Sequence, residues 1–392
     1  MRARKITEGV YWVGAVDWDR AYFDALIELP DGTSYNAYLV QGSDKTALID
    51  TVDPEFSDLL FDRLEKLNTP IDYIIANHAE QDHSGTLPQV LEMYPDAPLV
   101  CTEKCKAMLV DLGLANGTEF ITVEDGETIS LGDRTLEFIH APWVHWPETM
   151  LTYLQEDQIL FPCDLFGSHL ATTDLYGKTD AKLYDSAKRY FAEIMMPFRK
   201  IIKGHMEKLE NYEFSMIAPS HGPIYDNPDF ILDAYDDWIN GEPKNAVVLP
   251  FISMHGSTEK MVDHLLDALV ERGVKVHRFN MEHTPTGELA MALVDAATLV
   301  VGSPTFLTGA HPKIVYPVYL ANAIRPKTKF ISVIGSYGWG GKMAQQLTEM
   351  TSLIKAEQLD PVLIKGDPTE EDFAALDELA DQIADKHASL GE

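Results

Sequence analysis

The chain has 392 residues, of which 45% are hydrophobic and 24% charged, a composition typical of packed globular proteins and not of disordered or collagen-like chains. Because single hydrophobic cores stop growing near ~250–300 residues, this length predicts two or three domains. The 31 Lys and Arg residues against 62 Asp and Glu give a net charge of −31, which argues against nucleic acid and against an anionic membrane surface as partners.

The amino-terminal half predicts short strands at irregular spacing, with two helices among them. This mixture indicates an α/β sandwich built from mixed sheets. The predicted strands are Tyr35–Val40, Thr46–Ile49, Tyr73–Ala76, Leu99–Cys101, Leu136–Ile139, Met150–Leu154, Gln158–Pro162 and Met216–Pro219, and the predicted helices are Glu55–Lys66 and Tyr184–Leu209.

A group of potential metal ligands follows the predicted strand Tyr73–Ala76. Four side chains lie within six residues: His78, Glu80, Asp82 and His83. Residues two apart point the same way in an extended segment, so His78, Glu80 and Asp82 can converge before the chain turns at Ser84 and Gly85. A solvated polar loop is the alternative, and four potential ligands directly behind a buried strand make it the weaker one.

Three more potential ligands, His145, Asp164 and His221, each come after a later predicted strand of the same half. Taken singly, a strand-end aspartate commonly caps a helix, and a strand-end histidine is commonly structural. Together with the first group they make seven candidates from four strand ends. This number is enough for two metal ions and exceeds what one ion needs.

A change of pattern begins near Asp236–Asn245, where Gly241 and Pro243 interrupt regular structure. We therefore expect one domain over residues 1–244 and a second over residues 245–392. In the second, strands and amphipathic helices alternate, which predicts a doubly wound, five-stranded parallel sheet. Its predicted strands are Ala246–Ile252, Val274–Phe279, Thr298–Val301, Lys329–Ile334 and Pro361–Ile364, and its predicted helices include Glu259–Glu271, Lys342–Ile354 and Glu370–His387.

Three loops follow strands of this sheet, at the edge where such sheets bind ligands. The segment Ser253–Thr258 offers hydroxyl groups and the amino end of a helix, which suit a phosphate group without Lys or Arg. Taken alone, it is equally well explained as a turn and a helix cap. The segments Gly302–Phe306 and Gly335–Gly341 add aromatic side chains among small residues, as a planar ring would require.

These three loops resemble those of flavodoxin, and the resemblance extends through the domain. It implies flavin mononucleotide (FMN), with the phosphate on residues 253–258 and the isoalloxazine ring between residues 303–307 and 336–341. The implied contacts are Ser253, Met254, His255, Gly256, Ser257, Thr258, Ser303, Pro304, Thr305, Phe306, Leu307, Ser336, Tyr337, Gly338, Trp339, Gly340 and Gly341.

The ligand order H-x-E-x-D-H followed by His, Asp and His resembles the metallo-β-lactamase superfamily, whose hydrolases carry H-x-H-x-D-H. The resemblance implies an αβ/βα sandwich for the amino-terminal domain. Here Glu80 replaces the second histidine. Neutral imidazoles suit zinc and hydrolysis, whereas an added carboxylate favours two irons that change charge.

A lactamase-like domain with this ligand set, followed by a flavodoxin-like domain, is similar to the flavodiiron proteins over nearly the whole chain, including the segments Leu29–Tyr38 and His145–Glu148. The resemblance implies a non-haem diiron site. One iron would be bound by His78, Glu80 and His145, the other by Asp82, His83 and His221, with Asp164 as the bridge. In some members, water takes the place of the residue equivalent to His83.

The family resemblance also implies an activity and partners. The expected reaction is the reduction of dioxygen to water, of nitric oxide to nitrous oxide, or of both, with electrons passing through FMN. The expected donor is a rubredoxin or a reduced deazaflavin coenzyme. The expected assembly is a head-to-tail homodimer, or a dimer of such dimers, in which each flavin lies beside the partner's irons.

Two alternatives remain from the sequence. One is a zinc-dependent hydrolase with a regulatory flavodoxin domain, and the other is an electron carrier without a metal. No run of apolar residues predicts a secretion signal or a membrane span, so we expect a cytoplasmic protein. The three cysteines, Cys101, Cys105 and Cys163, include no C-x-x-C pair, so a rubredoxin module within this chain is not expected, and the thiols are interpreted as core residues.

Overall fold

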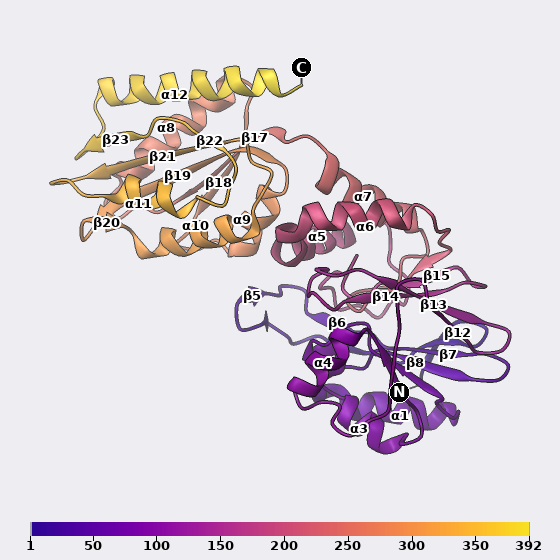
Figure 1. The fold of residues 1–392 in the computed structure, drawn as a ribbon. Helices are drawn as coiled ribbons and strands as arrows, with labels where there is room; N and C mark the ends of the chain where they lie inside the picture. The colour runs from indigo at the N-terminus through magenta and orange to yellow at the C-terminus, as the bar shows by residue number, and fades with distance from the viewer. Residues whose placement is uncertain (1, 392) are drawn as a thin grey trace. The chain divides into compact units, whose positions relative to one another are not determined.

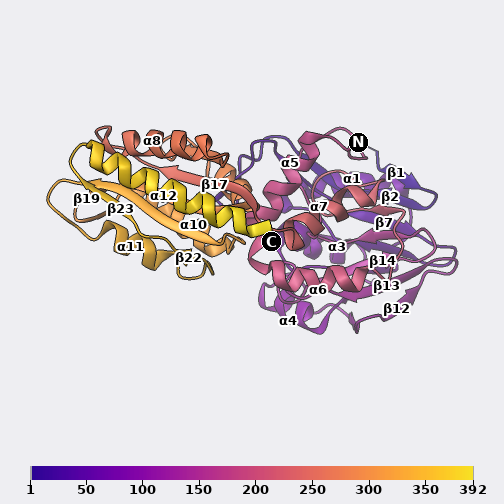
Figure 2. The same cartoon turned by 90° about the horizontal axis from the view of Figure 1, so that it is seen from above.

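The computed structural model describes residues 2–391 and divides them into two compact units. The first contains the residues up to Phe191 together with Phe198–Tyr235, and the second contains Ala192–Pro197 together with the residues from Asp236 onward. Both appear in Figures 1 and 2. The expected division after residue 244 stays a prediction, and its outermost residues, Met1 and Glu392, lie outside the described part. None of the described helices combines the length and apolar character needed to cross a membrane.

The first unit contains two principal sheets. The larger has the strand order β1 (Arg4–Thr7), β2 (Val10–Trp12), β7 (Tyr38–Gln41), β8 (Thr46–Ile49), β9 (Tyr73–Ile75), β10 (Leu99–Cys101), β11 (Phe120–Thr122). The smaller has the order β12 (Thr128–Ser130), β13 (Thr135–His140), β14 (Met150–Leu154), β15 (Ile159–Phe161), β16 (Met216–Ile217). Each sheet contains both parallel and antiparallel pairs, as the irregular strand spacing predicts.

The larger sheet is buried on both faces because its central strands are apolar throughout. Along β7, Tyr38 and Val40 point into the core shared with the smaller sheet, and Leu39 points into the core under the helices. Three helices cover that second face: α1 (Ser57–Leu67), α3 (Leu87–Met93) and α4 (Glu103–Asp111). The fully buried apolar strands therefore place their polar residues at the strand ends.

The predicted single helix Tyr184–Leu209 is wrong in one respect, because the structure has two helices there. These are α5 (Ala181–Tyr190) and α6 (Arg199–Leu209), separated by a π-helical turn at Phe191–Met195 and a 3₁₀ turn at Met196–Phe198. Pro197 has no amide hydrogen for a continuing helix, which accounts for the interruption. The unit also contains two small ribbons and two further helices: β3 (Ala15–Asp17) with β6 (Thr33–Tyr35), β4 (Tyr22–Phe23) with β5 (Ile27–Glu28), the short helix α2 (Gln81–Ser84), and the start of α7 (Pro228–Asn240).

The second unit is the predicted doubly wound sheet. Its principal strands run parallel in the order β18 (Lys275–Asn280), β17 (Lys244–Phe251), β19 (Ala296–Phe306), β21 (Phe330–Tyr337), β23 (Val362–Lys365). Two short strands, β20 (Gly309–Ala310) and β22 (Glu357–Gln358), extend it. On one face lie α8 (Ser257–Glu271) and α12 (Glu370–Ala388), and on the other lie α9 (Thr286–Leu293), α10 (Pro312–Ile324) and α11 (Met343–Met350), as Figure 1 shows.

Candidate functional site

The turn after β9 carries the first group of polar side chains and is held by buried hydrogen bonds. The Asn77 amide and its side-chain Nδ2 both donate to the Asp50 carboxylate, at 2.8 and 2.9 Å, and Asn77 Oδ1 accepts from Thr152 Oγ1 at 2.7 Å. The short helix α2 then turns the chain back, and Ser84 Oγ donates to the carbonyls of residues 79 and 80. The segment that begins at Asn77 is thereby tied to residues of both sheets.

All seven strand-end side chains of the sequence analysis meet at one place. They form two groups, in each of which the potential ligand atoms lie within 4.8 Å of one another. One group is His78, Glu80, His145 and Asp164, and the other is Asp82, His83 and His221. In the first, Glu80 Oε2 lies 3.2 Å from His78 Nε2 and 3.0 Å from His145 Nε2. In the second, Asp82 Oδ2 lies 3.3 Å from His83 Nε2 and 3.2 Å from His221 Nε2.

Asp164 lies between the groups and presents one oxygen to each. Its Oδ2 lies 3.5 Å from His78 Nε2 and 3.3 Å from His145 Nε2. Its Oδ1 lies 2.9 Å from His83 Nε2 and 3.4 Å from His221 Nε2. A carboxylate in this position can bind one ion with each oxygen.

The chemistry of this cluster fits cations better than internal hydrogen bonds. Both carboxylate oxygens of Asp82, both ring nitrogens of His83 and Oδ1 of Asp164 are buried and make no well-aligned hydrogen bond among the described residues, although His83 Nε2 and Asp164 Oδ1 lie only 2.9 Å apart. Buried polar atoms without partners are costly, and buried charges in proteins are normally paired or bound to metal. The set of imidazoles and carboxylates therefore fits two divalent or trivalent metal ions.

The electrostatics of the metal-free chain lead to the same conclusion. Burial opposes protonation of His78, but hydrogen bonds to Glu148 and Glu80 outweigh it and raise the His78 pKa to about 10. Burial is likewise outweighed at His83, where the Asp82 and Asp164 carboxylates raise the pKa to about 9. The carboxylates stabilise positive charge in the cluster. Protons or metal ions can provide that charge, and they compete for the same imidazole nitrogens.

Two of the histidines are oriented by a hydrogen bond from Nδ1, the ring nitrogen that faces away from the cluster. His78 Nδ1 lies 2.7 Å from Glu148 Oε1, which also accepts the Ala79 amide at 3.0 Å. His221 Nδ1 donates to the Ser34 carbonyl at 2.7 Å. In each case the bonded nitrogen carries hydrogen, so the opposite nitrogen, Nε2, keeps its lone pair for a metal.

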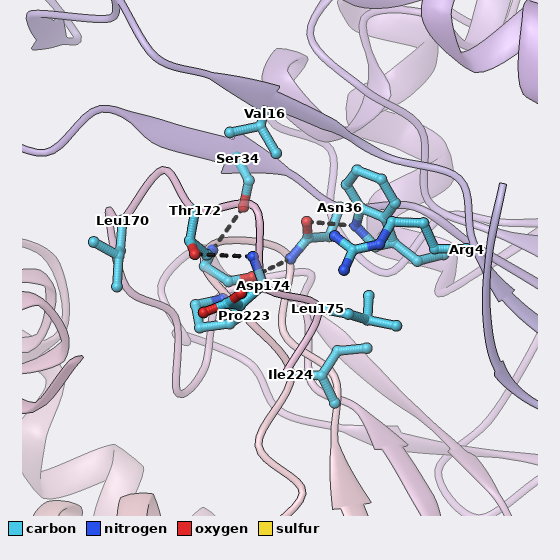
Figure 3. A pocket seen from close by; sticks show the side chains of 12 residues that line it. Arg4, Val16, Ser34, Asn36, Leu170, Thr172, Asp174, Leu175, Pro223 and Ile224 are labelled. Carbon is cyan, nitrogen blue, oxygen red and sulfur yellow. Dashed lines mark hydrogen bonds between the residues drawn. The ribbon is translucent and has the colours of Figure 1, made fainter. Parts of the chain in front are cut away.

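The loop that carries His221 is hydrogen-bonded to two residues in and just after β6, Ser34 and Asn36. Asn36 Nδ2 donates to the Pro219 and Gly222 carbonyls, both at 2.7 Å, and the Gly222 amide donates to Ser34 Oγ at 2.8 Å. Figure 3 shows Ser34 and Asn36 in a small pocket whose lining also includes Pro223. These bonds fix the position at which His221 enters the cluster.

Several residues beside the cluster were given no role by the sequence. Glu148 lies only three residues after His145, and that spacing was the available signal. His169 is buried, with Nδ1 2.9 Å from Thr33 Oγ1 and its ring centroid 5.0 Å from that of His221, and no pattern in the sequence singles it out. The Cys163 thiol, interpreted as a core residue, lies within 4.8 Å of potential ligand atoms of His83 and Asp164.

In the second unit, the segment Ser253–Thr258 connects β17 to α8. Gly256 has φ +92°, a backbone conformation that residues other than glycine rarely adopt. Its amide donates a hydrogen bond to Ser253 Oγ at 3.1 Å. The fifteen-residue helix α8 begins at Ser257, so its amino end and its positive partial charge face this loop. The geometry suits an anion such as phosphate.

The other two predicted loops lie at the same edge of the sheet. Ser336 pairs with Pro304 in the register of β19 and β21, and its Oγ lies 3.1 Å from Thr258 Oγ1 of the first loop. Two apolar side chains of these loops are largely exposed, Leu307 at 78% and Trp339 at 84%. The three loops thus form one continuous edge with apolar side chains free to cover a planar group.

Both units match known protein families. A family described as "ODP family beta lactamase" matches residues 33–222, and one described as "Flavodoxin" matches residues 249–377. The expected metallo-β-lactamase-like sandwich and flavodoxin-like sheet are therefore confirmed.

Similar proteins extend the match to nearly the whole chain. The nitric oxide reductase of Moorella thermoacetica is 37% identical over 389 residues, which is 97% of each protein. Among solved structures, the rubredoxin oxygen:oxidoreductase from Desulfovibrio gigas has a TM-score of 0.95 at 29% identity and covers 99% of each chain. The flavodiiron protein from Giardia intestinalis has a TM-score of 0.91 at 26% identity over 100% of this chain and 98% of that one.

Proposed function

Because the chain belongs to the flavodiiron protein family, we propose that this oxidoreductase reduces dioxygen to water, nitric oxide to nitrous oxide, or both. When bound, a pair of iron ions would supply the site at which the gas is reduced, and FMN would accept electrons from a donor and pass them on. The observation that carries the proposal is the bridging position of Asp164 between two groups of imidazole and carboxylate side chains.

The first iron would be held by His78, Glu80 and His145, and the second by Asp82, His83 and His221, with Asp164 shared. Each group contains two histidines and one carboxylate, a set that accommodates iron in more than one charge state. Glu80 is central to this assignment, since its oxygen faces both histidines of its group. The zinc-dependent hydrolase is the less favoured alternative, because the compared relatives are named for redox reactions.

FMN would be held by the three loops of the second unit, with its phosphate at Ser253–Thr258 and its ring between residues 303–307 and 336–341. The left-handed turn at Gly256 and the amino end of α8 support the phosphate position. The exposed side chains of Leu307 and Trp339 support the ring position. In this proposal, residues 1–244 hold the two irons and residues 245–392 hold FMN.

The electron donor in this proposal is a rubredoxin or a reduced deazaflavin coenzyme, and the expected location is the cytoplasm. The similarity to a protein named rubredoxin oxygen:oxidoreductase supports the first donor.

The working form would be a head-to-tail homodimer or a dimer of such dimers. Exposed apolar side chains beside each candidate site support an interface there. The β4–β5 hairpin carries Tyr22, 54% exposed, and Leu26, 44% exposed, while its Phe23 packs against the His221 ring at a centroid distance of 6.1 Å. In the second unit, the loops proposed to hold FMN carry the exposed apolar side chains of Leu307 and Trp339, which support an interface on that side.

The test is reconstitution of the full chain with ferrous iron and FMN under anaerobic conditions. Each donor is then supplied in turn, and dioxygen or nitric oxide is added while an electrode records its consumption. We expect about two irons and one flavin per chain, consumption of at least one gas with one donor, and a dimer or tetramer in sedimentation. Two zinc ions with esterase activity, or a chain without flavin, would contradict the proposal.

A further inference from the structure

We infer that Glu148 makes the two metal positions unequal, so that the ion held with His78 is bound more tightly and is harder to reduce than its neighbour. The inference rests on the proposed diiron function and concerns a positioning residue, since Glu148 acts through His78.

The ligands themselves are matched in charge. Each group has two histidines and one carboxylate, Glu80 in the first and Asp82 in the second, and the groups share the carboxylate of Asp164. The ligands alone therefore give no reason for one ion to be held differently from the other. Any charge difference must come from the groups behind the ligands.

The residues behind the two ligand groups differ in what accepts the Nδ1 hydrogen bond of a ligand histidine. Behind the first group, His78 donates its Nδ1 hydrogen to the carboxylate of Glu148 at 2.7 Å. Behind the second, His221 donates its Nδ1 hydrogen to a neutral backbone carbonyl, that of Ser34, also at 2.7 Å. A carboxylate raises the electron density of the imidazole more than a carbonyl does, which strengthens the bond from Nε2 to a metal.

Glu148 is placed to act strongly and in one orientation. Its side chain and that of His78 are both 0% exposed, so solvent screens the charge little. The Ala79 amide holds Oε1 at 3.0 Å, and Thr102 Oγ1 donates to the Glu148 carbonyl at 2.9 Å. The other oxygen, Oε2, is buried without a hydrogen-bond partner among the described residues. The negative charge of Glu148 therefore acts mainly on His78 and, through it, on the metal ion that His78 would bind.

Two other acidic side chains near the cluster interact with both groups. Asp50 is bonded by Asn77 and interacts electrostatically with both His78 and His83. Asp24 interacts electrostatically with Glu80 and His145 of the first group and with Asp82 of the second. Asp53 interacts electrostatically with Asp82 of the second group. Glu148 differs from these three because it accepts a hydrogen bond from a ligand histidine, His78.

The decisive variant is Glu148→Gln, which keeps a hydrogen-bond acceptor for His78 and removes the charge. The metal-free full chain is titrated anaerobically with ferrous iron. We expect about 10- to 100-fold weaker binding of one of the two ions, while the other retains its affinity. The variant Asp82→Asn weakens binding in the second group, so the ion that it still binds tightly is the one held with His78. Adding Glu148→Gln to Asp82→Asn must lower the affinity for that ion.

A second readout follows the electrons. In a reductive titration monitored by electron paramagnetic resonance, the two one-electron reductions of the iron ions should lie closer together in potential in Glu148→Gln than in the parent chain. The control Glu137→Gln removes a carboxylate from β13 of the same unit, where Tyr212 and Gln155 bind it away from the cluster, and should change neither readout.

The outcomes separate this inference from the proposed function. A parent chain that binds no iron overturns both. A parent chain that binds two ions, with Glu148→Gln lowering both affinities equally or neither, overturns the inference alone. If Glu148→Gln does not fold by circular dichroism, Glu148→Asp decides: its side chain is one methylene shorter and lengthens the contact to His78, so the affinity of one ion alone must fall, and an equal loss at both ions or no loss would overturn the inference.

Discussion

Substitution of Gly222 by alanine is expected to destabilise the first unit and to displace His221. Gly222 directly follows His221 and has φ +82°, in the left-handed region that favours glycine. A Cβ at this position would lie 2.0 Å from Ser168 Oγ and 2.7 Å from the Ser168 carbonyl oxygen. The second contact is with backbone, so the loop itself has to move.

The expected cost has two parts. A non-glycine residue in the left-handed region costs about 1–2 kcal/mol, and overpacking of a closed site costs about 1–3 kcal/mol. Their sum, about 2–5 kcal/mol, corresponds to a fall in melting temperature of about 4–20 °C for a unit of this size. The movement also strains the hydrogen bonds from Asn36 and to Ser34 that locate the loop.

Calorimetry of the metal-free chain measures the melting temperature, and metal analysis of the reconstituted chain measures the iron content. The matched control is Gly204→Ala, because Gly204 lies exposed within α6 and a Cβ added there would meet nothing within 4 Å beyond its own helix. Alanine favours the helix by about 0.5–1 kcal/mol, so this control should melt slightly higher. Adding Ser168→Ala to Gly222→Ala should recover part of the loss, since it removes the 2.0 Å contact and leaves the 2.7 Å one.

If Gly222→Ala melted with the parent chain and kept both irons, the argument from backbone conformation and close contact would be wrong. Loss of stability with both irons retained would show that the loop moves without carrying His221 with it.

Three further predictions concern the two candidate sites. Asp164→Asn replaces one bridging oxygen with an amide nitrogen that cannot bind a metal, so metal analysis should find fewer than two irons per chain; two tightly bound irons would contradict the bridge. In the metal-free chain, the pKa values of His78 and His83, about 10 and about 9, lie above the ordinary 6.5. The stability that these protons contribute is complete below pH 6.5 and is lost as the pH rises through 9 to 10, so calorimetry should give a lower melting temperature at pH 9.5 than at pH 6.5, and a higher one would refute this. Gly256→Ala meets no atom within 4 Å but is strained at φ +92°; it should cost about 1–2 kcal/mol and weaken flavin retention in gel filtration, and full retention would argue against the phosphate loop.

The sequence by itself was sufficient to predict those features of the two sites that are built from residues close together in the chain. His78 and Glu80 lie two residues apart behind an apolar strand, so their place in one group follows from local backbone geometry. Asp82 does not fit that extended pattern, because α2 begins at Gln81 and Asp82 lies in the other group. The alternation of strands and helices after Asn245 predicted the doubly wound sheet for the same reason, since each element is defined by a few neighbouring residues.

Other features depend on segments that are distant in sequence, and only the tertiary structure decided them. The break between α5 and α6 was missed because the apolar pattern runs across Pro197. The contact from His78 to Glu148 joins residues 70 positions apart, and the contact from Thr33 to His169 joins residues 136 apart. The sequence identified side chains able to bind metals, but distances between strand ends determine which atoms face each other, and those distances are set by how the two sheets pack.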